Sequence, residues 1–316
     1  MGSLQIDFTF LYFCAPMQVE YNTPPKAVIK GENKDIYLFS TAGENISDMV
    51  VRDFGLEWMK FKDYSDKDIR SLAIMYFDIL DDTIINKNTY ALDIGCGTGR
   101  WTKYLSDRLG FIEAIDPSNA VIAADHLLRN VDNVRISKAA VETIPFDDET
   151  FDFVMSIGVL HHIPDTQKAM MDCVKKVKRG GYFYVYLYHN LDGTGRLKKM
   201  IFRCSETLRR FVSKLPPMTK KFACNFLAVT TYLPFVFAGR LLRFFGLDSI
   251  AKRLPLSDYQ NKSFFIIRND ALDKYGTTLE QRFSRDEVIT LMRKSGLGDI
   301  VVSPSSPYYH AIGKKM

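Results

Sequence analysis

Between positions 90 and 188, apolar and polar residues alternate with a regular rhythm. Short apolar runs, which are typical of buried strands, are separated by longer segments whose apolar residues recur at helical spacing. Strands are therefore expected at residues 90–94, 111–116, 133–137, 151–157 and 182–188, with helices at 100–109, 119–130 and 165–178. This alternation predicts an α/β fold, in which right-handed crossovers build a parallel sheet with helices on both faces.

The flanking segments follow other patterns. Short β-like runs mixed with turn formers come first, and helical periodicity follows up to about residue 80. Near the C-terminus, Ser284 and Glu287 have the spacing of a capping box and Gly296 that of a helix end, before two closing strands. We expect an N-terminal extension with a helical element at 1–85, a sheet core at 86–191, a helical insertion at 192–262, and a C-terminal completion of the core at 263–316.

The stretch "ALDIGCGTGRW", residues 91–101, places three glycines directly after an expected strand. Such a turn lets backbone N–H groups and the start of the next helix approach a ligand closely. The dinucleotide fingerprint G-x-G-x-x-G would need a third glycine at position 100, where Arg100 stands. Asp116 lies about 20 residues further on, at the end of the next strand, where an acidic residue can bind ribose hydroxyls.

The motifs "LDIGCGTGRW", "AIDPS", "ETIPFDDETFDFVMSIGVLHHIPD" and "VKRGGYFYVYLY" together resemble the class I S-adenosylmethionine-dependent methyltransferases. The resemblance covers roughly residues 90–188 and is nearest to the small-molecule group that includes the ubiquinone and menaquinone C-methyltransferases. It implies a Rossmann-like, seven-stranded, mostly parallel sheet with an antiparallel last strand. "FGLEWMKF" and residues 259–287 also resemble, less specifically, bacterial methyltransferases of glycan and secondary-metabolite pathways.

The resemblance implies S-adenosylmethionine as cofactor and assigns residues to it. Asp93 would hold the amino group, or would only organise the turn, and Asp116 would accept from both ribose hydroxyls. The family's usual Asp on the adenine is replaced by Ala140, so contact is expected from the backbone around Val141. The residues expected at the cofactor are Asp93, Gly95, Cys96, Gly97, Gly99, Asp116, Pro117, Ser118, Ala140, Val141, Ser156, Ile157 and, as a shield, Trp58.

Methyl transfer from a sulfonium relies on alignment of donor and acceptor and on exclusion of water. Some acceptors also need a general base whose pKa lies near neutral pH. Histidine suits that task, and the candidates are His161, His162 and His189. In "VLHHIPD", bracing of the turn is the alternative role for the first two. Substrate contacts are assigned to Tyr188, Arg196, Tyr259 and Tyr308. The sequence contains no metal-ligand spacing, so no metal is expected.

Charge is concentrated in residues 193–253, which hold thirteen Lys and Arg against two acidic residues. This block is therefore about +11 within a chain of net charge +5. It includes residues 222–239, eighteen uncharged residues near the lower limit of a membrane span. Three interpretations compete: a cap over the active site, a segment on an anionic membrane surface, and an RNA-binding surface without a recognisable RNA module.

The remaining composition is ordinary for a globular protein, and the five scattered cysteines suit a reducing cytosol. The N-terminal apolar run lacks a basic flank, so no signal peptide is predicted.

We expect a cytoplasmic enzyme, peripheral to the membrane if the basic block binds lipid. Its methyl acceptor is expected to be a small anionic molecule modified at O or N, because a positive field favours acidic partners. The alternatives are RNA or protein as substrate, or a non-catalytic cofactor-binding subunit.

Overall fold

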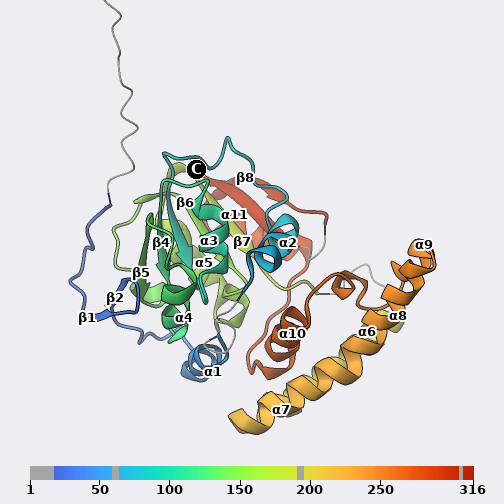
Figure 1. Ribbon diagram of the computed structural model, residues 1–316. Coiled ribbons are helices and arrows are strands. Elements are labelled where there is room, and N and C mark those ends of the chain that lie inside the picture. Colours follow the sequence, from blue (N-terminus) through green and yellow to red (C-terminus); the bar gives the residue numbers. More distant parts are fainter. Residues whose placement is uncertain (1–17, 59–63, 191–195, 306–308) are drawn as a thin grey trace, which may run out of the picture.

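The computed structural model describes residues 18–58, 64–190, 196–305 and 309–316. Nine strands form one sheet in the order β1-β2-β5-β4-β3-β6-β7-β9-β8. Figure 1 shows β2 beside β5 at one side of this sheet and β8 at the other. The strands are β1 (Ala27–Lys30), β2 (Asp35–Leu38), β3 (Tyr90–Ile94), β4 (Phe111–Ile115), β5 (Val134–Lys138), β6 (Phe151–Ile157), β7 (Val177–Tyr186), β8 (Leu297–Val302) and β9 (His310–Lys315).

The strand directions confirm the expected α/β class. The six strands from β2 to β7 run parallel, whereas β9 is antiparallel to both of its neighbours, β7 and β8. The sheet has two strands more than expected because β1 and β2 form a hairpin that extends the β5 edge. The Asp125 carboxylate fixes the turn of this hairpin by accepting from the Lys34 amide at 2.7 Å.

Helices cover both faces of the sheet. Trp101 and Leu105 of α3 and Val121 of α4 belong to the hydrophobic cluster on one face. Met170 of α5 and Met292 of α11 belong to the cluster on the other. The elements concerned are α1 (Asp48–Trp58), α2 (Asp66–Tyr76), α3 (Arg100–Ser106), α4 (Ala120–Leu127), α5 (Thr166–Lys175), α11 (Arg285–Lys294) and two short 3₁₀ turns (Val141–Thr143 and Leu160–His162). The expected capping box of α11 is confirmed, with Ser284 and Glu287 each accepting from the other's amide.

The insertion is helical, as its pattern predicted. It comprises α6 (Arg196–Val212), α7 (Pro217–Leu227), a π-helical turn (Ala228–Tyr232), α8 (Leu233–Phe244), α9 (Asp248–Ala251) and the 3₁₀ turn Ser257–Tyr259, followed by α10 (Phe264–Gly276). One continuous helix, 218–244, runs along the outer edge of the molecule, with α10 between it and the sheet in Figure 1. Buried residues of α7, α8 and α10 share a third hydrophobic cluster.

Candidate functional site

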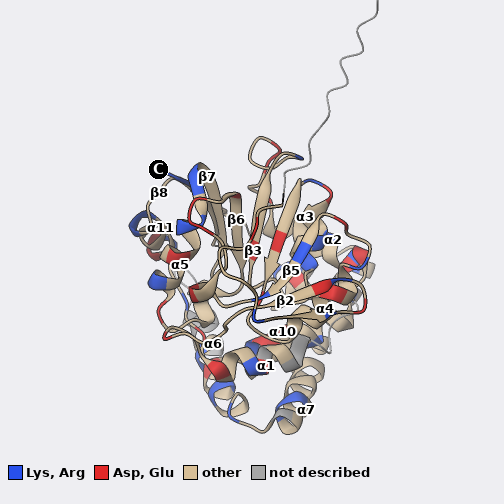
Figure 2. Cartoon of the chain, turned by 90° about the vertical axis from the view of Figure 1, so that its left-hand side faces the viewer, with Lys and Arg blue, Asp and Glu red and all other residues tan. Residues whose placement is uncertain are grey.

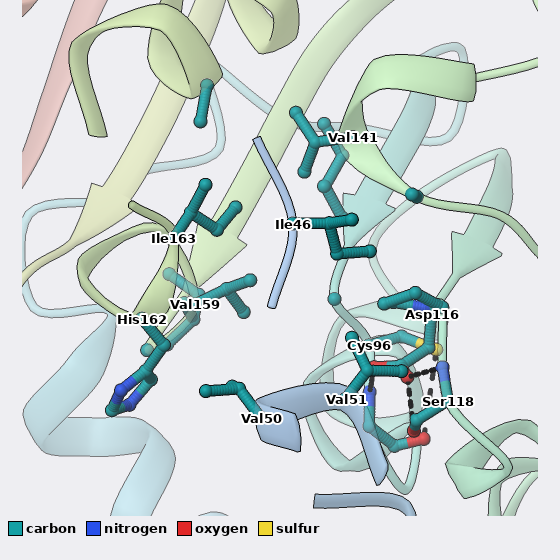
Figure 3. Close-up of a pocket in the computed structure, with 18 of the residues that line it drawn as sticks. Ile46, Val50, Val51, Cys96, Asp116, Ser118, Val141, Val159, His162 and Ile163 are labelled. Atoms are coloured by element: carbon teal, nitrogen blue, oxygen red, sulfur yellow. Dashed lines mark hydrogen bonds between the residues drawn. The ribbon is translucent and has the colours of Figure 1, made fainter. Parts of the chain in front are cut away.

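A cavity lies at the carboxyl ends of β3, β4 and β6, which is where parallel α/β sheets bind their ligands. The start of α1 covers it, through Ile46, Val50 and Val51, and α10 contributes Asp273 to its lining. Figure 3 shows Asp116 and Ser118 toward one end of this cavity and His162 toward the other. The cavity therefore joins the glycine turn to a second, more distant group of residues.

The glycine turn has the backbone conformation that only glycine adopts without strain. Gly95, Gly97 and Gly99 have φ values of 75°, 54° and 78°. A Cβ added to Gly95 would lie 2.4 Å from Cγ2 of Val159, so the position is also sterically closed. Gly95 and Gly97 line the cavity, together with Cys96 and Thr98, whereas Gly99 serves the start of α3 instead.

Asp116 is held rigidly at the end of β4. Its Oδ2 accepts from the Gly97 amide at 3.0 Å, and its Oδ1 accepts from the amide and hydroxyl of Ser118 at 2.8 and 2.6 Å. Burial raises the pKa of this carboxyl, and the bonds from Ser118 and Gly97 oppose that shift. A carboxylate offers about four lone-pair sites, so Oδ2 keeps capacity for another donor, as a ribose hydroxyl requires.

The expected adenine side is apolar. Pro117, Ala140 and Val141 line the cavity, and Figure 3 shows Val141 beside Ile46. The Glu142 carboxylate connects this wall to the cover, because it accepts a hydrogen bond from the Asn45 amide at 3.0 Å. The same carboxylate forms an ion pair with Lys168. The sequence did not indicate this cover, since its pattern from 44 onward predicted only a helix.

Three described residues expected at the cofactor do not line the cavity: Asp93, Gly99 and Ser156. Asp93 is buried and accepts from the Thr102 hydroxyl at 2.6 Å. Burial raises its pKa to about 7, against the opposing effect of Thr102. Ser156 donates to the Ile94 carbonyl at 3.1 Å, within the sheet. A role of Asp93 at the amino group stays a prediction; its described partner supports the organisation of the turn.

The far end of the cavity contains polar residues from four elements. Tyr188 follows β7 and donates its hydroxyl to the Asp273 carboxylate of α10. Burial raises the pKa of Asp273 to about 6, although the bond from Tyr188 lowers it. Tyr76 packs edge-on against Tyr186, and Arg100 donates to the Tyr64 hydroxyl at 2.9 Å. Sequence reasoning found only Tyr188 of this group.

The three candidate histidines lie in different surroundings. His162 lines the cavity, where its Nδ1 pairs with the Leu279 carbonyl at 2.7 Å and burial lowers its pKa to about 4. His161 is fully buried and is not among the lining residues. Its ring stacks on the Tyr188 ring, with the two ring centroids 3.9 Å apart. His189 contacts Tyr309 and is not among the lining residues. A direct catalytic role therefore stays a prediction for all three, with His162 best placed and His161 placed to brace the turn.

Of the other expected substrate residues, only Tyr259 has a described side chain, and it does not line the cavity. Tyr259 packs edge-on against Tyr232 within the insertion, at 5.2 Å between ring centroids. Tyr308 and the side chains of Trp58 and Arg196 lie outside the described residues. Among the described lining residues, Arg100 is the one Lys or Arg, so the basic block 193–253 does not supply charge there. Within those residues, no group of three His, Cys, Asp or Glu is arranged to hold a metal.

Polar groups of the cavity wall fit the expected cofactor. The Thr98 hydroxyl, inside the glycine turn, has no hydrogen-bond partner among the described residues, although it is buried. A ligand with a carboxylate or amino group would satisfy it, as the methionine part of S-adenosylmethionine does. With the Asp116 carboxylate for the ribose and the apolar wall at Val141 for the adenine, the donors and acceptors match each part of that molecule.

Comparison with known proteins identifies the segment that builds this site. The model of a family described as a methyltransferase domain matches residues 92–185. The ubiquinone biosynthesis O-methyltransferase of Coxiella burnetii is 26% identical over 107 residues, which are 33% of this chain and 46% of that protein. The demethylmenaquinone methyltransferase of Staphylococcus aureus is 32% identical over 107 residues, 33% of this chain and 44% of that protein.

The chain thus matches less than half the length of these curated relatives. A solved S-adenosylmethionine-dependent methyltransferase of Thermotoga maritima is 18% identical, with 83% of this chain and 94% of that chain covered and a TM-score of 0.42. That score is too low to support detail, so the fold rests on the strand order described above.

Proposed function

We propose that the chain transfers a methyl group from S-adenosylmethionine to a small molecule, because residues 92–185 match the model of a methyltransferase-domain family and the curated relatives are methyltransferases. The family implies S-adenosylmethionine as donor and S-adenosylhomocysteine as product. We assign the transfer to an oxygen or nitrogen atom of the acceptor.

One observation carries the proposal: a single cavity joins Asp116 and the glycine turn to the hydrogen-bonded pair of Tyr188 and Asp273. The first end offers a carboxylate and backbone turn suited to the cofactor. The second offers a carboxylate that can accept a hydrogen bond from an O–H or N–H group. A donor and an acceptor bound at these two ends would meet inside the cavity, as direct transfer requires.

The cofactor, when bound, supplies a methyl group already activated by its sulfonium. The residues of the chain therefore have to position the acceptor, exclude water and receive a proton. Ile46, Val50 and Val51 line the cavity with apolar side chains, and we assign the exclusion of water to them. Asp273, with a pKa raised to about 6, is ionised at pH 7 and can receive the acceptor's proton on its carboxylate. His162 is neutral at that pH, and its lowered pKa of about 4 makes it a weaker proton acceptor than Asp273.

An anionic acceptor remains part of the proposal, with a different physical basis from the charge of the insertion. Arg100 is the one Lys or Arg among the described residues that line the cavity, and its guanidinium lies 4.7 Å from the Trp101 ring centroid. A carboxylate or phosphate on the acceptor would reach this guanidinium, which binds such groups in a planar fork. We propose a small metabolite or an intermediate of glycan or secondary metabolism as this acceptor.

The test is release of S-adenosylhomocysteine across pairs of small acceptors that differ only in the presence of a carboxylate or phosphate. We expect turnover with anionic members, and a fall in kcat of about 100-fold or more for Asp273→Asn, the order that general-base catalysis contributes. Asp258→Asn, an exposed change in the insertion, is the control. Unchanged kcat in Asp273→Asn would contradict the assignment, and cofactor binding without any turnover would favour a non-catalytic subunit.

A further inference from the structure

The long helix 218–244 has an exposed apolar face. Apolar side chains recur along it every three to four residues, and Met218, Phe222 and Phe244 are 82%, 72% and 82% exposed. Six residues mark this face: Met218, Phe222, Phe226, Phe237, Leu241 and Phe244. At about 1.5 Å per residue, the helix is roughly 40 Å long. Such a continuous apolar stripe on the surface indicates an interaction site.

The opposite side of the same helix is fixed to the rest of the protein. Cys224, Ala228, Tyr232 and Val236 are buried in the third hydrophobic cluster. Polar ties accompany them: Tyr232 donates to Asp270 of α10 at 2.9 Å, and α10 also binds α7 through Arg268 and Asn225 at 3.0 Å. The Lys220 ammonium pairs with Asp53 of α1 at 2.7 Å.

Length and composition would allow this helix to cross a membrane. Its polar contacts with α10 and α1 argue against a membrane-spanning position. Only 28% of its most apolar window is buried, so the helix has one protein-bound side and one exposed side. A spanning helix would have to carry the Lys220–Asp53 pair and α10 into the hydrocarbon, which is costly. An amphipathic helix bound to a folded domain instead lies parallel to the membrane plane, with its apolar side in the interface.

The charge around this face identifies the surface it fits. Residues 193–253 carry thirteen Lys and Arg and two acidic residues, and Figure 2 marks Lys and Arg along α6 and α7. Among the described side chains, the exposed cations of this block are Arg203, Arg210, Lys214, Arg240, Lys252 and Arg253. Polybasic segments next to an amphipathic helix bind the negative headgroups of anionic phospholipids. A second copy of this chain would bring like charges together.

We propose that the exposed face of helix 218–244, with the cations of 193–253, docks this protein on an anionic phospholipid surface. This inference goes beyond the methyl transfer proposed above and does not depend on it. The docking face is one helix away from the cavity, because α10 contacts helix 218–244 through Arg268 and Asp270 and lines the cavity with Asp273. Docking would therefore place the acceptor end of the cavity near the membrane.

The experiment is co-sedimentation of the full chain with vesicles of phosphatidylcholine alone and of phosphatidylcholine with phosphatidylglycerol. The test variant is Phe222→Asp/Phe237→Asp, which changes two exposed side chains. The matched control is Ile74→Asp, because Ile74 of α2 is 70% exposed but lies outside the insertion. An unchanged thermal unfolding transition and an unchanged circular dichroism spectrum would show that each variant is folded.

We expect the wild type and Ile74→Asp to bind the anionic vesicles at least about tenfold more tightly than neutral ones, and 0.5 M salt to weaken that binding. The double variant should bind the anionic vesicles about tenfold or more weakly, since it places two charges in the interface. Three results would overturn the proposal: no binding of the wild type, equal binding of the double variant, or equal binding to both vesicles. A dimer in sedimentation that the double variant abolishes, without vesicle binding, would assign the face to a second copy.

Discussion

Replacing Gly95 by Ala should reveal how strongly the glycine turn depends on its bare backbone. The residue has a φ of 75°, a left-handed conformation that costs a residue with a Cβ about 1–2 kcal/mol. The new Cβ would also lie 2.4 Å from Cγ2 and 2.8 Å from Cγ1 of Val159. Overpacking of this kind costs about 1–3 kcal/mol, so the total loss of unfolding free energy is expected to be about 2–5 kcal/mol.

Gly246 provides a matched control for the backbone part of that loss. Its φ is also 75°, but no heavy atom lies within 4 Å of an added Cβ. Gly246→Ala should therefore cost only about 1–2 kcal/mol. At about 2–4 °C per kcal/mol, Tm should fall by roughly 10 °C in Gly95→Ala and by about 4 °C in Gly246→Ala.

Thermal unfolding and calorimetric titration of S-adenosylmethionine are the assays. Gly95 lines the cavity whereas Gly246 lies in the insertion, so only Gly95→Ala should weaken cofactor binding. Adding Val159→Ala to Gly95→Ala should recover part of the stability, because it removes both Cγ atoms that the Cβ approaches; a double-mutant cycle measures this coupling. Equal Tm losses in Gly95→Ala and Gly246→Ala, without coupling to Val159, would refute the steric reasoning.

Three further predictions concern single hydrogen bonds and one titration. Thr102→Val should cost about 1–3 kcal/mol in denaturant unfolding, because buried Asp93 loses its 2.6 Å donor, while Thr102→Ser should restore most of it; equal stability of both would contradict the role of that bond. Methyl transfer should decline as pH falls through about 6, where Asp273 becomes protonated, and a profile flat to pH 5 would exclude it as proton acceptor. Folding raises the pKa of Asp273, so the stabilisation that its protonated carboxyl contributes is present at low pH and is lost as pH rises through about 6. This pH dependence of stability runs opposite to that of methyl transfer. Ser284→Ala should cost about 1 kcal/mol of unfolding free energy through loss of the α11 cap, and no change in Tm would contradict this.

The cofactor end of the site was predictable because its signal is local. The glycine spacing at 95–99 sets a backbone conformation, and Asp116 follows at the distance that one βαβ unit imposes. The structure places both at one cavity, with a direct bond from the Gly97 amide to Asp116. Alternation of strands and helices likewise predicted the parallel sheet, since each crossover must cover one of its faces.

The acceptor end was not predictable because its residues meet only through tertiary packing. Asp273 lies 85 residues from its partner Tyr188, inside a helix that carries no motif. Histidine at 161 suits catalysis by residue type, yet packing against Tyr188 buries it completely. The hairpin of β1 and β2 joins the sheet at the β5 edge, which periodicity alone does not specify.

Net charge suggests the sign of a partner's charge, which stays a prediction, but it does not indicate where that partner binds. The block 193–253 suggested an anionic acceptor, whereas Arg100 is the cation among the described residues of the cavity wall. The net charge of a segment does not indicate which of its side chains face a cavity. Several of the described Lys and Arg side chains of helices α6 to α8 are exposed to solvent. That charge instead accompanies the apolar face of helix 218–244.

Calorimetric titration of S-adenosylmethionine into the wild type and into Asp116→Asn tests the central claim most directly, with NADH as competing ligand and the exposed Asp82→Asn as control. Hydrogen bonds to a charged group contribute about 1.5–3 kcal/mol each, so the dissociation constant should rise by about 10- to 100-fold in Asp116→Asn and stay unchanged in Asp82→Asn. Tighter binding of NADH, or an unchanged dissociation constant in a folded Asp116→Asn, would contradict the assignment of this cavity to S-adenosylmethionine.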